Sequence, residues 1–98
     1  MTGLQHKVVL ITGASGGIGQ SLAAEFSRAG TTVVISSRNE EKLRTLAEQL
    51  RRDGGQTLPL RCDVAEREQV YALCAMIAKQ VGTVQILINS AGIGPVMV

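Results

Sequence analysis

The 98-residue sequence is poor in cysteine and has no long apolar run, and each shortage excludes a class of protein. Its two cysteines, Cys62 and Cys74, form no Cys-x-x-Cys pair, so the sequence supports neither a disulfide framework nor a metal site. The longest strongly apolar runs cover residues 8–11 and 33–35, far fewer than the roughly 20 residues that cross a membrane. We therefore expect reduced thiols, no membrane span and a cytoplasmic location.

The sequence also lacks a strong excess of either charge. It contains 10 Lys and Arg residues against 8 Asp and Glu residues, which gives a formal net charge of +2. Nucleic acids and membrane surfaces attract concentrated basic patches, whereas the two signs are interspersed here. We expect neither among the partners. The length and a hydrophobic fraction of 45% fit one globular domain over residues 1–98.

What the sequence does contain is a regular alternation of strand-like and helix-like segments. Aliphatic and β-branched runs predict strands at residues 8–11, 32–36, 57–61 and 85–89. Apolar residues recurring every three or four positions predict helices at residues 18–29, between Asn39 and Gly54, and at 66–81. Right-handed crossovers make such strands parallel. The prediction is an α/β fold, a Rossmann-type doubly wound parallel sheet of order β-α-β-α-β-α-β, with strands arranged 3-2-1-4 and Pro59 near an edge.

Three glycines, Gly13, Gly17 and Gly19, follow the first strand and open the first helix. Glycine permits a positive φ and lets a ligand approach the backbone closely, and a helix N-terminus attracts phosphate. The alternative is a plain tight loop between strand and helix. Because the glycines lie within a strand–helix–strand unit, they predict a dinucleotide-phosphate site. The absence of Gly-Lys-Ser/Thr excludes a Walker-type phosphate loop.

The end of the second strand indicates which dinucleotide binds. An NAD site usually places a carboxylate there to bind the ribose 2′-hydroxyl, but this chain has Ser37 and Arg38. Arg38 can bind a 2′-phosphate through charge-assisted bonds, and Ser37 can donate another. The alternative is that Arg38 is a solvated surface charge. The residues favour NADP(H) over NAD(H).

Two further strand ends contribute candidate residues. Asp63 follows the third strand, and Glu66 lies three residues later, so together they can form a capping box for the next helix. Asp63 can also contact an adenine edge, and the two interpretations are compatible. Asn89 ends the fourth strand and can either tie adjacent strands or hydrogen-bond a ribose. The small residues after it allow the backbone to lie against a flat ligand.

As a set, residues 12–19, 37–38, 63–64 and 89–92 resemble the short-chain dehydrogenase/reductase family. The glycine run alone would also suit the family's extended, sugar-nucleotide branch, but residues 89–92 favour the shorter reductase branch. The resemblance implies pyrophosphate-side contacts from Gly13, Ser15, Ile18 and Gly19. It also implies that Arg38 binds the 2′-phosphate and that Asp63 and Val64 contact the adenine. The ribose contacts that it implies come from Asn89, Ala91 and Gly92.

The sequence departs from the family pattern at three places. Gly16 stands where members preferring NADP(H) often carry a basic residue, and Ser90 stands where a second Asn is commonest. The family's catalytic Ser and Tyr-x-x-x-Lys have no counterpart, because Tyr71 is followed four residues later by Ala75. His6 precedes the first strand and is expected at the surface. No catalytic residue is therefore assigned in this chain.

The resemblance implies that the chain is the cofactor-binding N-terminal part of a longer oxidoreductase. Such an enzyme moves a hydride between NADP(H) and a small carbonyl or alcohol substrate, and is expected to be a homo-oligomer when complete. The alternatives are a non-catalytic dinucleotide-binding module, an inactive fragment, or a methyltransferase on a similar sheet, against which Ser37 and Arg38 argue. By itself, the chain is expected to be marginally stable or prone to aggregate, because residues 86–88 would form an unpaired apolar edge on a partly bare sheet.

Overall fold

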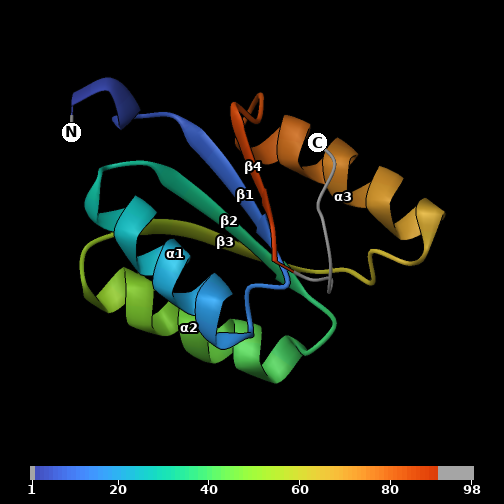
Figure 1. The fold of residues 1–98 in the computed structure, drawn as a ribbon. Coiled ribbons are helices and arrows are strands. Elements are labelled where there is room, and N and C mark those ends of the chain that lie inside the picture. The colour runs from blue at the N-terminus through green and yellow to red at the C-terminus, as the bar shows by residue number, and fades with distance from the viewer. Residues whose placement is uncertain (1, 91–98) are drawn as a thin grey trace.

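Strands and helices alternate along this computed structural model, which describes residues 2–90 (Figure 1). The strands are β1 (Val8–Thr12), β2 (Thr32–Ser37), β3 (Gln56–Arg61) and β4 (Ile86–Asn89). The helices are α1 (Gly17–Arg28), α2 (Glu40–Arg52) and α3 (Arg67–Gln80), and a short 3-10 turn, Thr2–Leu4, precedes β1. The predicted order of elements is confirmed, with boundaries that differ by one or two residues.

All neighbouring strands in the sheet run parallel, in the order β3-β2-β1-β4. The predicted order 3-2-1-4 is therefore confirmed. Thr12, at the end of β1, pairs with Ser36 of β2 and with Asn89 of β4. Pro59 lies in β3, at one edge of the described sheet. An edge strand has a neighbouring strand on one side only, so the N–H that proline lacks removes no hydrogen bond between strands on the outer side. This register brings the carboxyl ends of the strands to one edge.

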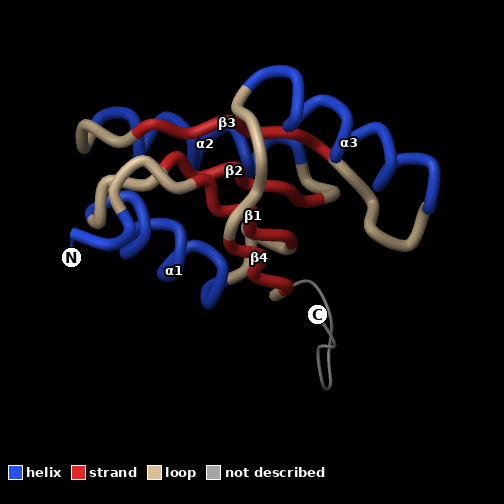
Figure 2. The backbone as a smooth tube through the Cα atoms, turned by 90° about the horizontal axis from the view of Figure 1, so that it is seen from above, coloured by secondary structure: helices blue, strands red, loops and turns tan. Residues whose placement is uncertain are grey.

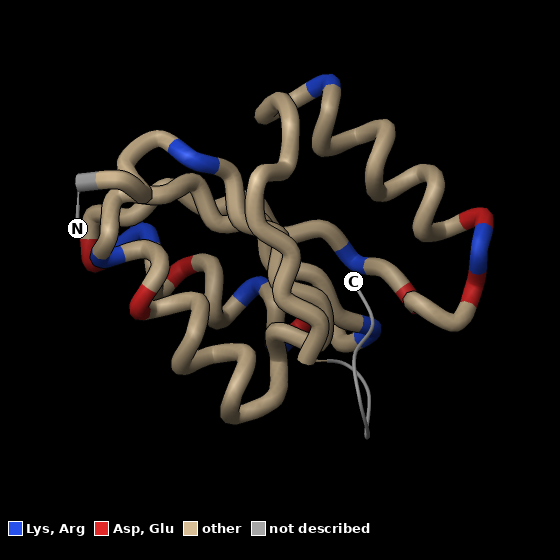
Figure 3. The backbone as a smooth tube through the Cα atoms, turned by 45° about the horizontal axis from the view of Figure 1, so that its top comes forward, with Lys and Arg blue, Asp and Glu red and all other residues tan. Residues whose placement is uncertain are grey.

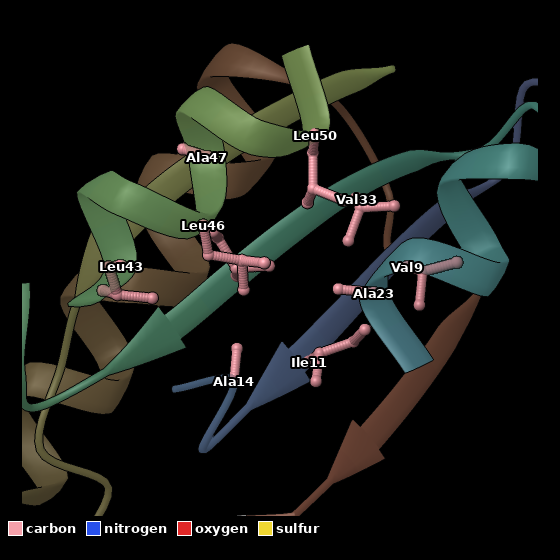
Figure 4. Packing of buried hydrophobic residues seen from close by; sticks show 10 residues of the cluster. Val9, Ile11, Ala14, Ala23, Val33, Leu43, Leu46, Ala47 and Leu50 are labelled. Atoms are coloured by element: carbon pink, nitrogen blue, oxygen red, sulfur yellow. The ribbon is translucent and has the colours of Figure 1, made fainter. Parts of the chain in front are cut away.

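The two faces of the sheet are covered by different helices (Figures 1 and 2). Side chains alternate along β1, so Val9 and Ile11 pack under α1 and α2, while Val8 and Leu10 pack under α3. Figure 4 shows Val9 and Ile11 among the apolar side chains of α1 and α2. Because β1 is buried on both faces, apolar side chains are needed on both, which explains its continuous aliphatic run.

The ends of α2 follow the signals in its sequence. Asn39 is the N-cap, and its side-chain oxygen accepts a hydrogen bond from the Lys42 N–H at 3.0 Å. Gly54, just after the C-cap Asp53, has a φ of +89°, the left-handed conformation that glycine adopts without strain. The predicted cap and stop of this helix are confirmed.

The start of α3 differs from the prediction. The helix begins at Arg67 with Glu66 as its N-cap, and no side chain caps it, so the capping box of Asp63 and Glu66 is wrong. Asp63 instead closes a turn: its carbonyl accepts from the Glu66 N–H and its carboxylate accepts from the Ala65 N–H, both at 3.0 Å. The Asp side chain bonds to the backbone two residues on, and this local turn displaces the helix start.

Part of the sheet face under α3 is uncovered within the described residues. Ile86 and Ile88 of β4 pack against the core on the α1 side, whereas Leu87 points to the other face and is 41% exposed. This agrees with the partly bare face expected from the sequence. Met76 and Tyr71 of α3 are also exposed. Among residues 2–90, no helix has both the length and the apolar character required to cross a membrane.

Candidate functional site

The structure places a cleft of about 520 Å³ at the carboxyl ends of the strands. This is where parallel α/β sheets bind their ligands. The cleft is lined by Gly13, Ser15, Gly16, Ser37, Arg38, Asn39, Cys62, Asp63, Val64, Ala65 and Ser90. Of the predicted site residues, Gly17, Ile18, Gly19 and Asn89 do not line this cleft, and Ala91 and Gly92 lie outside the described residues.

The glycine turn between β1 and α1 presents backbone donors. Gly13 has a φ of +66°, and its carbonyl accepts from the Gly16 N–H at 3.2 Å. Within residues 2–90, the N–H groups of Gly17, Ile18 and Gly19, in the first turn of α1, make no hydrogen bond. These donors and the positive end of the helix dipole suit an anion.

The glycines of this turn serve different purposes. A Cβ on Gly19 would lie 2.7 Å from both Ala14 Cα and the Gly13 carbonyl oxygen, so the chain's own packing requires glycine there. Among residues 2–90, a Cβ on Gly17 would meet no atom within 4 Å. The packing of this part of the chain therefore does not require glycine at position 17, whereas a ligand approaching the turn would. Ile18, between them, is 74% exposed.

The end of β2 is tied to the glycine turn. The hydroxyl oxygens of Ser15 and Ser37 lie 2.8 Å apart, and Ser37 Oγ also accepts from the Asn39 N–H at 3.0 Å. Arg38 follows with an exposed side chain and makes no ion pair with any residue from 2 to 90. Its guanidinium is therefore available to a ligand in the cleft, which Asp63 also lines. Elsewhere, basic and acidic positions are interspersed along the described backbone (Figure 3).

The end of β3 supplies the wall that contains Cys62, Asp63 and Val64. Cys62 is almost completely buried, and its N–H donates to the Ser37 carbonyl at 3.0 Å. Burial raises the pKa of the Cys62 thiol, and the neighbouring charge of Asp63 adds to the shift. The thiol therefore stays protonated and unreactive near neutral pH. Val64 presents an apolar surface that is 43% exposed.

The residues at the end of β4 contact the glycine turn from the side opposite β2. Asn89 ties adjacent strands, one of its two predicted roles, because its side-chain oxygen accepts from Thr12 Oγ1 at 3.0 Å. Ser90 was not predicted as a site residue, yet it lines the cleft, and its hydroxyl donates to the carbonyls of Thr12 and Gly13. Its partners lie 77 and 78 residues away, so no local signal could have revealed this contact.

Two residues considered for chemistry lie outside the cleft. His6 is exposed and precedes β1, at the end of that strand opposite the cleft. Its backbone N–H donates to the Gly30 carbonyl. Tyr71 is 66% exposed on α3. Within residues 2–90, no group of three His, Cys, Asp or Glu side chains could hold a metal ion.

Comparison with known proteins gives one consistent family. A family model described as short chain dehydrogenase matches residues 7–98. A short chain dehydrogenase of Pseudocercospora fijiensis is 36% identical over 90 residues, which are 92% of this chain and 29% of that protein. The 7alpha-hydroxysteroid dehydrogenase of Escherichia coli is 36% identical over 91 residues, which are 93% of this chain and 36% of that enzyme.

A solved structure has the same architecture. The crystal structure of a metagenomic short-chain oxidoreductase in complex with NADP matches with a TM-score of 0.88 and 32% sequence identity. The match covers 93% of this chain and 41% of that one. The chain thus spans between 29% and 36% of the length of the two curated relatives above.

Proposed function

This chain belongs to the short-chain dehydrogenase family, and on that premise we propose that it forms the nicotinamide-dinucleotide-binding part of an oxidoreductase. One observation carries the proposal: a single cleft is lined both by Gly16, which directly precedes the unpaired N–H groups at the start of α1, and by Arg38, which makes no ion pair among residues 2–90. When bound, the cofactor would donate or accept the hydride, and the residues of this chain would bind and orient it.

The residues present fit such a cofactor. The unpaired N–H groups of Gly17 and Ile18 would hold the pyrophosphate, and the absence of a side chain on Gly17 would leave room for it. Asp63 and Val64 would contact the adenine. Asn89 would lie along the ribose, as would Ala91 and Gly92, which are outside the described residues.

We assign NADP(H) as the preferred cofactor because of the residues at the end of β2. No carboxylate stands there to bind a ribose 2′-hydroxyl, and the exposed guanidinium of Arg38 can make charge-assisted bonds to a 2′-phosphate. The hydroxyls of Ser15 and Ser37 line the same cleft, and the one that does not donate to the other would be a further donor. The similar metagenomic oxidoreductase was solved with NADP, which supports the same assignment.

The reaction proposed for the whole protein is hydride transfer between NADP(H) and a small carbonyl or alcohol. Among residues 2–90, no Tyr, His or Lys lines the cleft. Asp63 lines it but accepts from the Ala65 N–H, and burial raises the pKa of the Cys62 thiol, so the proton that accompanies hydride transfer would be moved by a group outside residues 2–90. The contribution of residues 2–90 would be binding and orientation.

Calorimetric titration of the complete protein with NADP⁺ and NAD⁺ tests the proposal. Arg38→Ala should raise the Kd for NADP⁺ by about tenfold to a hundredfold, because charged hydrogen bonds are lost, and should leave the Kd for NAD⁺ within about twofold. Arg52→Ala is the control, since Arg52 is also exposed but lies at the far end of α2. Equal losses for both dinucleotides would contradict the 2′-phosphate assignment, and no binding of either by the wild-type protein would contradict the whole proposal.

A further inference from the structure

We propose that Ser90 is a positioning residue that orients the glycine turn for the pyrophosphate, an inference that rests on the proposed dinucleotide site. Its side chain is half-buried at the end of β4, where it lines the cleft. Ser90 Oγ donates to the carbonyl oxygens of Thr12 at 2.7 Å and Gly13 at 3.1 Å. The Ser90 N–H donates to Thr12 as well, at 3.0 Å. The residue that follows β4 therefore holds two consecutive carbonyls, that of the last residue of β1 and that of the residue after it.

The peptide unit between Gly13 and Ala14 is held at both ends. Its carbonyl accepts from Ser90 Oγ and from the Gly16 N–H, and its N–H donates to the Ser36 carbonyl of β2 at 3.0 Å. Gly19 packs directly over the same carbonyl oxygen, where a Cβ would come within 2.7 Å. The turn is thus anchored to β2 on one side and to β4 on the other.

This anchoring matters because Gly13 is a glycine in the left-handed conformation. Its φ of +66° lies in a region where glycine has many alternatives, so the residue itself does not select one conformation. Without the Ser90 hydroxyl, the Gly13 carbonyl would keep only the longer bond from the Gly16 N–H, at 3.2 Å. The orientation of the N–H groups that follow would then be less restricted, and binding a phosphate would require ordering them.

The consequence for binding differs from that of Arg38. NAD⁺ and NADP⁺ share the pyrophosphate, so loss of the Ser90 hydroxyl should weaken both equally. The hydroxyl contributes one bifurcated hydrogen bond, and its loss should raise each Kd by about threefold to tenfold. A purely structural role would lower the stability of the protein and leave both Kd values unchanged.

The test uses the complete protein with Ser90→Ala, with Ser90→Thr to retain the hydroxyl, and with Thr57→Val as a matched control. Thr57 Oγ1 donates to the Val33 carbonyl at 2.8 Å, also between strands, but away from the cleft. Calorimetry with NAD⁺ and NADP⁺ gives the Kd values, and denaturant unfolding gives the stability. The amide resonances of Gly16 and Gly17 in the unliganded protein report the conformation of the turn directly.

The proposal expects equal weakening of both dinucleotides and shifted Gly16 and Gly17 amide resonances in Ser90→Ala, with binding restored in Ser90→Thr. It expects Thr57→Val to lower stability without changing either Kd. The proposal is overturned if Ser90→Ala loses stability but keeps both Kd values and both amide resonances. That outcome would leave the assignment of the cleft intact, because wild-type binding and its sensitivity to Arg38→Ala are measured separately.

Discussion

The hydroxyl oxygens of Ser15 and Ser37 lie 2.8 Å apart, although 22 residues separate them in the sequence. This contact joins the glycine turn, which would hold the pyrophosphate, to the end of β2, which would hold the 2′-phosphate. Ser37 Oγ also accepts from the Asn39 N–H, so the same hydroxyl supports the backbone on both sides of Arg38. The two halves of the proposed cofactor site are therefore structurally connected before any ligand arrives.

A carboxylate at position 37 should reverse the cofactor preference. In Ser37→Asp, the new negative charge would repel a 2′-phosphate and could accept a hydrogen bond from a ribose 2′-hydroxyl. We expect the Kd for NADP⁺ to rise by about a hundredfold and the Kd for NAD⁺ to stay equal or fall, as measured by calorimetry. Ser37→Asn is the uncharged control of the same size. Equal losses of NADP⁺ affinity in both variants would show that shape, not charge, controls this position.

Alanine should lower stability at position 19 but not at position 17. Gly19→Ala forces a Cβ to within 2.7 Å of backbone atoms and should lower the free energy of unfolding by about 1–3 kcal/mol. The methyl group of Gly17→Ala meets no atom of residues 2–90 within 4 Å, and the variant should keep equal or higher stability, since alanine favours a helix. It should nevertheless weaken dinucleotide binding, because the new methyl group occupies ligand space. Unchanged Kd values in Gly17→Ala, measured by the same titration, would remove Gly17 from the binding site.

The two thiols should react at different rates. Burial raises the pKa of the Cys62 thiol, whereas Cys74 is exposed on α3. At pH 7.5, a brief pulse of iodoacetamide followed by peptide mapping should label Cys74 and leave Cys62 unmodified until denaturant is added. Rapid labelling of both in the native protein would contradict the buried position of Cys62.

The same thiol predicts a dependence of stability on pH. The ordinary pKa of 9.0 applies to Cys62 in the unfolded chain, and the folded value is higher. The unfolded chain therefore loses this proton first, so the contribution of Cys62 is fully present below pH 9.0 and decreases as the pH rises above it. Urea titrations across this range should show a smaller decrease in Cys62→Ala. An identical decrease in wild type and Cys62→Ala would assign it to other groups.

The exposed side of β4 should govern the association of the 98-residue chain by itself. Leu87 is 41% exposed on a strand that forms one edge of the described sheet. We expect concentration-dependent association, measured by light scattering, and a reduction in Leu87→Lys, because a charge on an edge strand opposes pairing. Tyr71→Lys, at an exposed position on α3, is the control for charge alone. Equal reductions in both variants would indicate a general effect of charge.

Much of the fold could be predicted because its signals are local. Continuous aliphatic strands, helical spacing and helix-ending glycines determine the elements, and right-handed crossovers then leave few arrangements of a parallel sheet. The same local signals placed the glycine turn and Arg38 at the cleft. They failed at Asp63, where a turn and a helix cap compete for the same side chain, and only the hydrogen bonds in the folded chain distinguish them.

The order of the strands, the edge at which a ligand would bind and the residue types available there could all be predicted from the sequence. The folded chain was needed to show that Gly19 serves packing, that no atom of residues 2–90 fills the space beside Gly17, and that Ser90 holds the carbonyl of Gly13. The physical reason is distance along the chain. Ser90 and Gly13 are 77 residues apart, and only the pairing of β4 with β1 brings that hydroxyl to the turn.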